Sequence, residues 1–96
     1  MTIFGLIGRY WVRSTPQFDE DCRYASTMFK KFQLVLGGLR HRIALGPEAG
    51  ADSGIGDGLL IMKVLPDRRL EAPGVSVLYK YDEANIYLLR LRVVGF

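Results

Sequence analysis

The sequence predicts an α+β domain in which two N-terminal helices pack on one face of a small twisted antiparallel sheet, in the order β-α-α-β-β-β. Three observations support this prediction. The chain begins with a run rich in β-branched and aromatic residues, a long segment with helically spaced apolar residues follows, and three short apolar runs come after a glycine-rich loop. The last two runs flank the turn-like stretch 82–85, which is typical of a β-hairpin.

The composition fits one folded domain over residues 1–96. Hydrophobic residues make up 49% of the chain, and 13 Lys and Arg against 10 Asp and Glu give a formal charge of +3, which permits an anionic partner without requiring one. The single cysteine, Cys22, and the single histidine, His41, exclude an intrachain disulfide and a cysteine or two-histidine metal site. We therefore expect a cytoplasmic protein without metal or other cofactor. We expect no membrane partner, because the apolar start of the chain is too short to span a bilayer.

A strand followed by two helices is predicted for the first half of the chain. Residues 9–14 favour a strand because they are rich in β-branched and aromatic side chains. Pro16, preceded by a serine and a threonine, is typical of the first turn of a helix. The dipeptide 46–47, Gly-Pro, is typical of a helix end. Ser26-Thr27 is the expected junction between the two helices, since both residues prefer caps to helix interiors.

Residues 46–58 form a loop by composition, and three strands are expected after it, at 58–65, 75–81 and 86–94. A sheet covered on one side alternates apolar residues inward with polar residues outward. This alternation predicts a core set on the three strands: Leu60, Met62, Val64, Val75, Val77, Tyr79, Tyr81, Tyr87, Leu89, Leu91 and Val93.

The basic residues of these strands fall on the opposite face, which the helices would leave open. Lys63, Lys80, Arg90 and Arg92 are predicted to share this face, with Arg68 and Arg69 on a neighbouring loop, and all six are predicted to bind a partner or phosphate. Apolar residues would lie among them: Leu59, Ile61, Leu65, Leu78, Ile86 and Leu88.

A mixed apolar and basic face favours a covered interface. An acidic, amphipathic segment of a partner protein would suit it, and RNA or another nucleic acid is the competing ligand. The third interpretation is an ordinary solvated face on which the aliphatic stems of Lys and Arg pack flat.

Three segments resemble the RelE/ParE superfamily of toxins from bacterial type II toxin–antitoxin systems. RYWVRSTPQFDEDC (9–22) resembles its opening, a strand followed by Thr-x-x-Phe leading into a helix. GLRHRIALGP (38–47) resembles the end of its second helix, and VSVLYKYDEANIYLLRLRVV (75–94) its last hairpin. The resemblance implies a similar β-α-α-β-β-β order and an antitoxin partner. It also implies one of two activities: cleavage of mRNA in the ribosomal A site, or inhibition of DNA gyrase without cleavage.

The ribonuclease branch of that family uses basic residues on the sheet with a Tyr or His near the C-terminus. Its usual arginine falls here on Ser76, three residues before Tyr79, and only Gly95 and Phe96 follow the last predicted strand. The expected catalytic Arg and C-terminal Tyr or His are therefore missing, and no catalytic residue is assigned. His41 is expected at the surface and Tyr79 in the core.

The favoured prediction is thus a RelE/ParE-like protein that acts mainly by binding an acidic antitoxin-like segment and a gyrase-type or ribosomal target. The alternatives are a ribosome-dependent mRNA endoribonuclease and a non-toxic self-associating or partner-binding module. The sequence also leaves open a homodimer.

Overall fold

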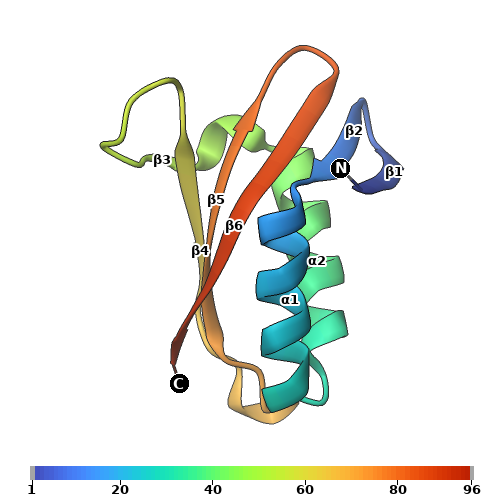
Figure 1. Ribbon diagram of the computed structural model, residues 1–96, viewed down its shortest axis with the longest axis vertical. Coiled ribbons are helices and arrows are strands. Elements are labelled where there is room, and N and C mark those ends of the chain that lie inside the picture. The colour runs from blue at the N-terminus through green and yellow to red at the C-terminus, as the bar shows by residue number, and fades with distance from the viewer. Residues whose placement is uncertain (1, 96) are drawn as a thin grey trace.

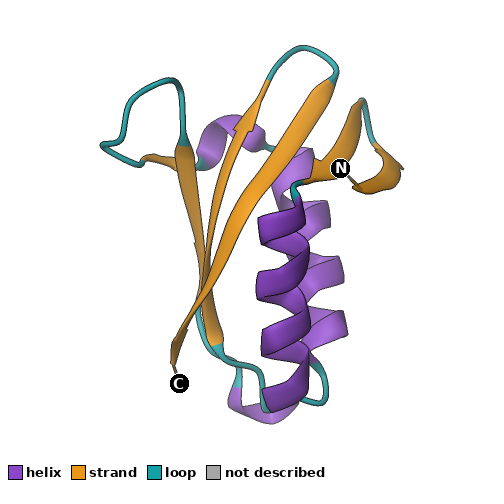
Figure 2. Cartoon of the chain, viewed as in Figure 1, coloured by secondary structure: helices purple, strands orange, loops and turns teal. Residues whose placement is uncertain are grey.

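The computed structural model describes residues 2–95, and over that range it has two α-helices and one six-stranded sheet (Figures 1 and 2). The elements are β1 (Thr2–Ile7), β2 (Tyr10–Ser14), α1 (Pro16–Met28), α2 (Phe32–Leu45), η1 (Pro47–Ala49), β3 (Ala51–Asp52), β4 (Leu60–Val64), η2 (Arg68–Leu70), β5 (Gly74–Tyr81) and β6 (Asn85–Gly95). The α+β class and the order strand, helix, helix, strand, strand, strand are confirmed. The N-terminal strand gains a hairpin partner, β1, and the glycine-rich loop contains the short strand β3.

The sheet has the order β1-β2-β6-β5-β4-β3, which places the first and last parts of the chain side by side. Its β5 and β6 strands form the expected antiparallel hairpin, but β2 and β6 are parallel, paired from Trp11 with Asn85 to Ser14 with Leu88. The prediction of a purely antiparallel sheet was therefore wrong. Side-chain alternation has the same period in parallel and antiparallel strands, so it gives no information on strand direction.

The start of α1 is tied to the sheet through its capping residue. Thr15 accepts a hydrogen bond from the Phe18 N–H through its hydroxyl oxygen, and Pro16 occupies the first helical turn, as predicted. The same threonine donates its N–H to the Leu88 carbonyl at 3.0 Å and its hydroxyl to the Leu89 carbonyl at 2.8 Å. Helix α1 therefore begins where β2 ends, held against β6.

The helix junction lies later than the sequence suggested. Helix α1 continues through Ser26 and Thr27 to Met28, and α2 begins at Phe32. The hydroxyl of Ser26 donates to the carbonyl of Cys22, and that of Thr27 donates to a carbonyl three residues earlier. Both polar side chains are thus satisfied inside the helix, which removes the reason for a break there.

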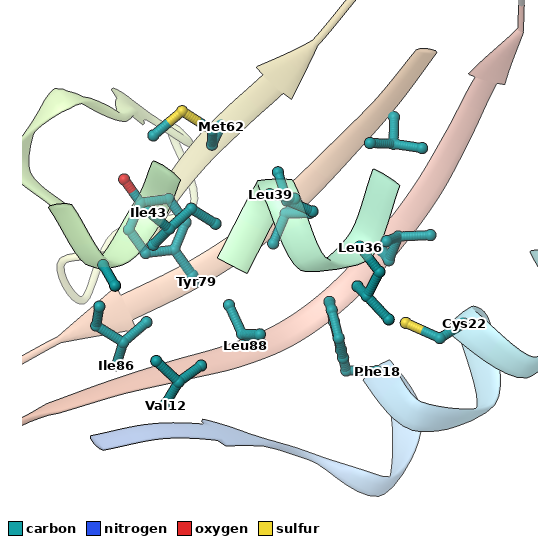
Figure 3. Packing of buried hydrophobic residues seen from close by; sticks show 14 of the residues in the cluster. Val12, Phe18, Cys22, Leu36, Leu39, Ile43, Met62, Tyr79, Ile86 and Leu88 are labelled. Atoms are coloured by element: carbon teal, nitrogen blue, oxygen red, sulfur yellow. The ribbon is translucent and has the colours of Figure 1, made fainter. Parts of the chain in front are cut away.

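Buried side chains from both helices and from β2, β4, β5 and β6 form one core cluster (Figure 3). On β4 and β5 the predicted alternation is confirmed: Met62, Val75, Val77 and Tyr79 are buried, and Leu60 and Val64 pack against the cluster. Tyr81 was predicted in the core but is exposed. It lies at the end of β5, where its ring meets that of Tyr10 edge-on, with the centroids 6.3 Å apart.

On β6 the predicted alternation holds only for the second half of the strand. Ile86 and Leu88, placed on the open face by the sequence, are fully buried, whereas Tyr87 and Leu89 are only half-buried. The cause is a register shift between β5 and β6. Leu78 pairs with Arg90 and Tyr79 with Leu88, so Leu89 has no partner on β5. This β-bulge reverses the inward and outward phase. After it, Leu91 is buried and Arg90 and Arg92 are exposed, as predicted.

Candidate partner-binding face

The open face is defined here by the strand residues that alternate with the core set: Trp11, Arg13, Ile61, Lys63, Ser76, Leu78, Lys80, Tyr87, Leu89, Arg90 and Arg92. The strand register aligns some of them in rows across the sheet. Lys63 pairs with Ser76, which pairs with Arg92, and the next row is Ile61, Leu78 and Arg90. Side chains that are directly opposite on neighbouring strands lie within contact distance of each other.

Lys63 and Arg92 flank Ser76 in the first row, and both basic side chains are exposed. Within residues 2–95 neither of them has an ion pair or a side-chain hydrogen bond. Two strand spacings separate their backbones by about 10 Å, a gap that the two long side chains can narrow over the serine. The row can therefore hold one carboxylate or phosphate between two cations, with a hydroxyl beneath it.

Arg90 was predicted to belong to the same free basic set, but it has a partner in its own chain. Its Nε donates to an Asp21 carboxylate oxygen at 2.9 Å and its Nη2 to the other at 3.3 Å. Asp21 on α1 also accepts the backbone N–H of Leu91. The hydrogen bonds to Asp21, and then its charge, raise the pKa of Arg90. Arg90 therefore links α1 to β6 and is less available to a ligand than Lys63 or Arg92.

Lys80 lies at the other end of the face, beside a hollow of about 620 Å³ that Tyr87 and Leu89 help to line. The Lys80 ammonium is 5.6 Å from the centroid of the Tyr87 ring, a cation–π distance. The Tyr87 hydroxyl donates to Asp82 at 3.3 Å. Asp82 accepts the N–H groups of Ala84 and Asn85, and these hydrogen bonds lower its pKa. The lining of the hollow thus includes the negatively charged side chain of Asp82 as well as the positively charged side chain of Lys80.

Arg68 and Arg69 lie on η2, between β4 and β5, so the strand rows do not include them. Both are exposed, and Arg69 is 3.8 Å from the Asp67 carboxylate. Figure 1 shows this connection at the end of the sheet opposite the β5–β6 turn. They therefore do not belong to the row of Lys63, Ser76 and Arg92.

Two open-face residues on β2 were missed by sequence reasoning. Trp11 is 44% exposed, and Arg13 donates its Nε to the Asn85 side chain at 2.8 Å. Both alternate with buried neighbours on β2, which was the signal available in the sequence. That signal could not be connected to the basic set, because the pairing of β2 with β6 was not foreseen. The open face therefore extends across β2 and carries an exposed indole.

His41 and Tyr79 do not belong to this face, whereas Tyr87 does. His41 is exposed on α2, and Tyr79 is buried with its hydroxyl donating to the Pro47 carbonyl at 2.6 Å. Burial is the main cause that raises the pKa of Tyr79. Among residues 2–95, no group of three or more His, Cys, Asp or Glu side chains is placed to hold a metal ion, and no helix is long and apolar enough to cross a membrane.

No protein-family model matches this chain, and a search of curated proteins gives no significant match.

Proposed function

We propose that this chain is a RelE/ParE-like protein that acts by binding, and that its open face receives an acidic, amphipathic segment of an antitoxin-like partner. The observation that supports this most directly is the row of Lys63, Ser76 and Arg92. It presents two exposed cations that have no ion-pair partner within residues 2–95. The order of strands and helices is also the one that the resemblance implies.

The neighbouring row supplies the apolar part of such an interface. Ile61 and Leu78 are half-buried beside the cations, and Leu89 is half-buried nearby on β6. On this proposal both helices cover the other face of the sheet and leave these side chains for the partner. Burial of the apolar residues would supply most of the affinity, while Lys63 and Arg92 would select acidic side chains and fix the orientation of the segment.

The site supports binding better than RNA cleavage. Cleavage needs a group that moves the 2′-hydroxyl proton beside the phosphate. The phenol of Tyr87 next to Lys80 is a feature that favours an endoribonuclease. Its hydroxyl, however, is bonded to Asp82, whose negative charge would repel a phosphate at that point. A gyrase-type or ribosomal target that is bound and not cut is therefore our preferred target class.

We assign the protein to the cytoplasm, where such partners and targets are found. The buried free thiol of Cys22 is consistent with a reducing compartment.

The test uses a synthetic acidic, amphipathic peptide as the probe, with binding measured by calorimetry. Lys63→Glu and Arg92→Glu should each weaken the complex by roughly 1–3 kcal/mol, if each cation faces a carboxylate. The matched control is Lys30→Glu, an exposed lysine between the two helices, which should bind like the wild type. Equal losses in all three variants, or none, would reject the open face as the binding surface.

A second measurement separates binding from cleavage. The wild-type protein is added to a translating extract, and the mRNA ends are mapped. We expect no site-specific cuts. Cuts at the ribosomal A site that disappear in Tyr87→Phe would replace the binding proposal with the endoribonuclease.

A further inference from the structure

A hollow of about 310 Å³ lies between the two helices and β1, and we call it the interhelical pocket. Helices α1 and α2 are in contact along this side of the molecule (Figure 1), and Phe4 of β1 adds its ring to the lining. Cys22 and Leu36, which belong to the core cluster shown in Figure 3, form the apolar inner wall. None of the described residues that line this pocket belongs to the open face.

The charged part of the interhelical pocket is built around Arg40 on α2. Its side chain is half-buried, and its guanidinium stacks on the Phe4 ring, with Cζ 4.0 Å from the ring centroid. Burial lowers the pKa of Arg40, which means that the surroundings disfavour its positive charge. The aromatic ring offsets part of this cost. Within residues 2–95, however, Arg40 has no ion pair and its N–H donors have no hydrogen-bond acceptor, so this partly desolvated cation lacks an anion.

Asp19 on α1 also lines the pocket, but its carboxylate is bound to other groups. One oxygen accepts the Ser14 hydroxyl at 2.5 Å, and the other accepts the Thr2 hydroxyl at 2.7 Å. In the part of the chain that the structure describes, Asp19 forms no ion pair with Arg40 or with Arg23, the second arginine of the lining. The lining therefore has two guanidinium groups and one carboxylate that does not pair with either of them.

Hydrogen-bond donors from both helices are available beside Arg40. Arg23, on α1, is exposed and has no ion-pair or hydrogen-bond partner among the described residues. The Gln33 amide, on α2, donates one N–H to the Ser26 hydroxyl at 3.3 Å and keeps a second N–H. A guanidinium binds a carboxylate through two parallel hydrogen bonds, so an acid placed against Arg40 can also accept from its neighbours.

We propose that the interhelical pocket binds a small monocarboxylic acid. Arg40 and Arg23 hold its carboxylate, and its apolar body lies against Phe4, Leu36 and Cys22. The charges of the lining leave one positive charge to neutralise, which matches a monoanion better than a phosphate dianion. The volume of about 310 Å³ is near the lower end of the range of small-molecule pockets, about 300–1,000 Å³, so the acid is small. The proposal does not rest on the proposed function, because the pocket shares no described residue with the open face.

The first test titrates phenylacetate into the isotopically labelled full chain and follows the backbone amide signals by NMR at neutral pH. Phenylacetate carries one ionised carboxylate on an aromatic body. We expect saturable binding with a Kd of about 5 mM or tighter. The signals that shift most should come from residues 19–26 of α1 and 33–40 of α2. Weaker or unsaturable binding, or shifts centred on the strands of the open face, would overturn the proposal.

Two further ligands test the chemical class of the acid on the same unmodified protein. Phenylacetamide has nearly the shape of phenylacetate without its charge, and it should bind at least about tenfold more weakly. Inorganic phosphate should also bind more weakly than phenylacetate, because it adds a second negative charge and has no apolar body. Equal binding of the amide, or tighter binding of phosphate, would reject a monocarboxylic acid as the ligand.

The second test removes the cation at the centre of the pocket. Arg40→Gln should weaken phenylacetate binding by at least about tenfold, since the carboxylate loses its paired N–H donors. Arg42→Gln is the matched control: it removes the same charge from the same helix, but Arg42 is exposed and lines a different hollow together with Lys63. This control should bind phenylacetate like the wild type. Unchanged binding in Arg40→Gln, or equal losses in the two variants, would show that Arg40 does not hold the acid.

Discussion

The two faces of the sheet differ in how completely their polar and charged groups are satisfied. On the core face, whose strand side chains belong to the buried cluster, every buried side-chain nitrogen and oxygen of the described residues has a hydrogen-bond partner, including Ser14 and the hydroxyl of Tyr79. On the open face, Lys63 and Arg92 have no ion-pair partner within residues 2–95. A buried polar group without a hydrogen-bond partner lowers the free energy of unfolding by about 1–3 kcal/mol, whereas an exposed one forms hydrogen bonds with water. The buried polar groups are therefore constrained by stability, whereas the exposed charges of Lys63 and Arg92 are not.

The bulge at Leu89 determines which side chains belong to which face. Leu88 and Leu89 are adjacent and chemically identical, yet Leu88 is fully buried and Leu89 is half-buried on the open face. Without the extra residue, the first half of β6 would have the opposite orientation. Truncating each leucine in turn is thus the most direct test of the contrast between the two faces.

The largest predicted effect is that of Leu88→Ala, which should lower the free energy of unfolding by about 2–5 kcal/mol because it leaves a cavity in the core. Leu89→Ala should cost about 1 kcal/mol or less, since half of its surface already meets solvent. Urea unfolding of both variants measures the difference. Similar costs for the two, or a larger cost for Leu89→Ala, would show that the bulge and the assignment of faces are wrong.

The sequence predicted the fold where one period of alternation runs through a whole element. On β5 the alternation of Val75, Val77 and Tyr79 with Ser76 and Leu78 was enough to assign both faces. On β6 it failed at the bulge. Leu88-Leu89 is apolar in either phase, so the one-residue shift leaves no trace in the hydrophobic pattern.

Strand alternation predicted only part of the candidate site, namely which strand residues are exposed. Lys63, Lys80 and Arg92 were correctly placed on the strands as exposed cations. The ion pair of Arg90 joins residues 69 positions apart, and the position of Trp11 beside β6 depends on a parallel pairing. Both are consequences of how the helices return the chain to the sheet, which local patterns do not specify.

Two tyrosine hydroxyls differ in the same way. Tyr79 on the core face donates to the Pro47 carbonyl at 2.6 Å, and Tyr87 on the open face donates to the exposed Asp82 carboxylate at 3.3 Å. Tyr79→Phe should lower the free energy of unfolding by about 1–3 kcal/mol, since a buried carbonyl loses its donor. Tyr87→Phe should change it by no more than about 0.5 kcal/mol, because water replaces the lost bond. Thermal unfolding of the two variants distinguishes these outcomes, and equal shifts would contradict the difference in burial.

The smallest predicted effect concerns pH, and it again separates a buried group from an exposed one. Burial, followed by the charges of Asp19 and Asp21, raises the pKa of Cys22 from 9.0 to about 12 in the folded chain. The unfolded chain therefore loses this proton first as the pH rises. The contribution of the thiol to stability is complete below about pH 9 and is lost between about pH 9 and 12. Asp82, exposed on the β5–β6 turn, has a lowered pKa, so its contribution is lost only as the pH falls below about 4.

The measurement compares wild type with Cys22→Ala, a variant that lacks the thiol but keeps every other titrating group. Cys22→Ala should be less stable near neutral pH because it opens a small cavity beside the core. Its deficit should shrink by about 1 kcal/mol between pH 8 and pH 10, since only the wild type loses stability through thiol ionisation. Unfolding in urea at several pH values gives both curves. Curves that stay parallel up to pH 10 would mean that the Cys22 thiol ionises as easily in the folded chain as in the unfolded one, and that α1 does not seal it from water.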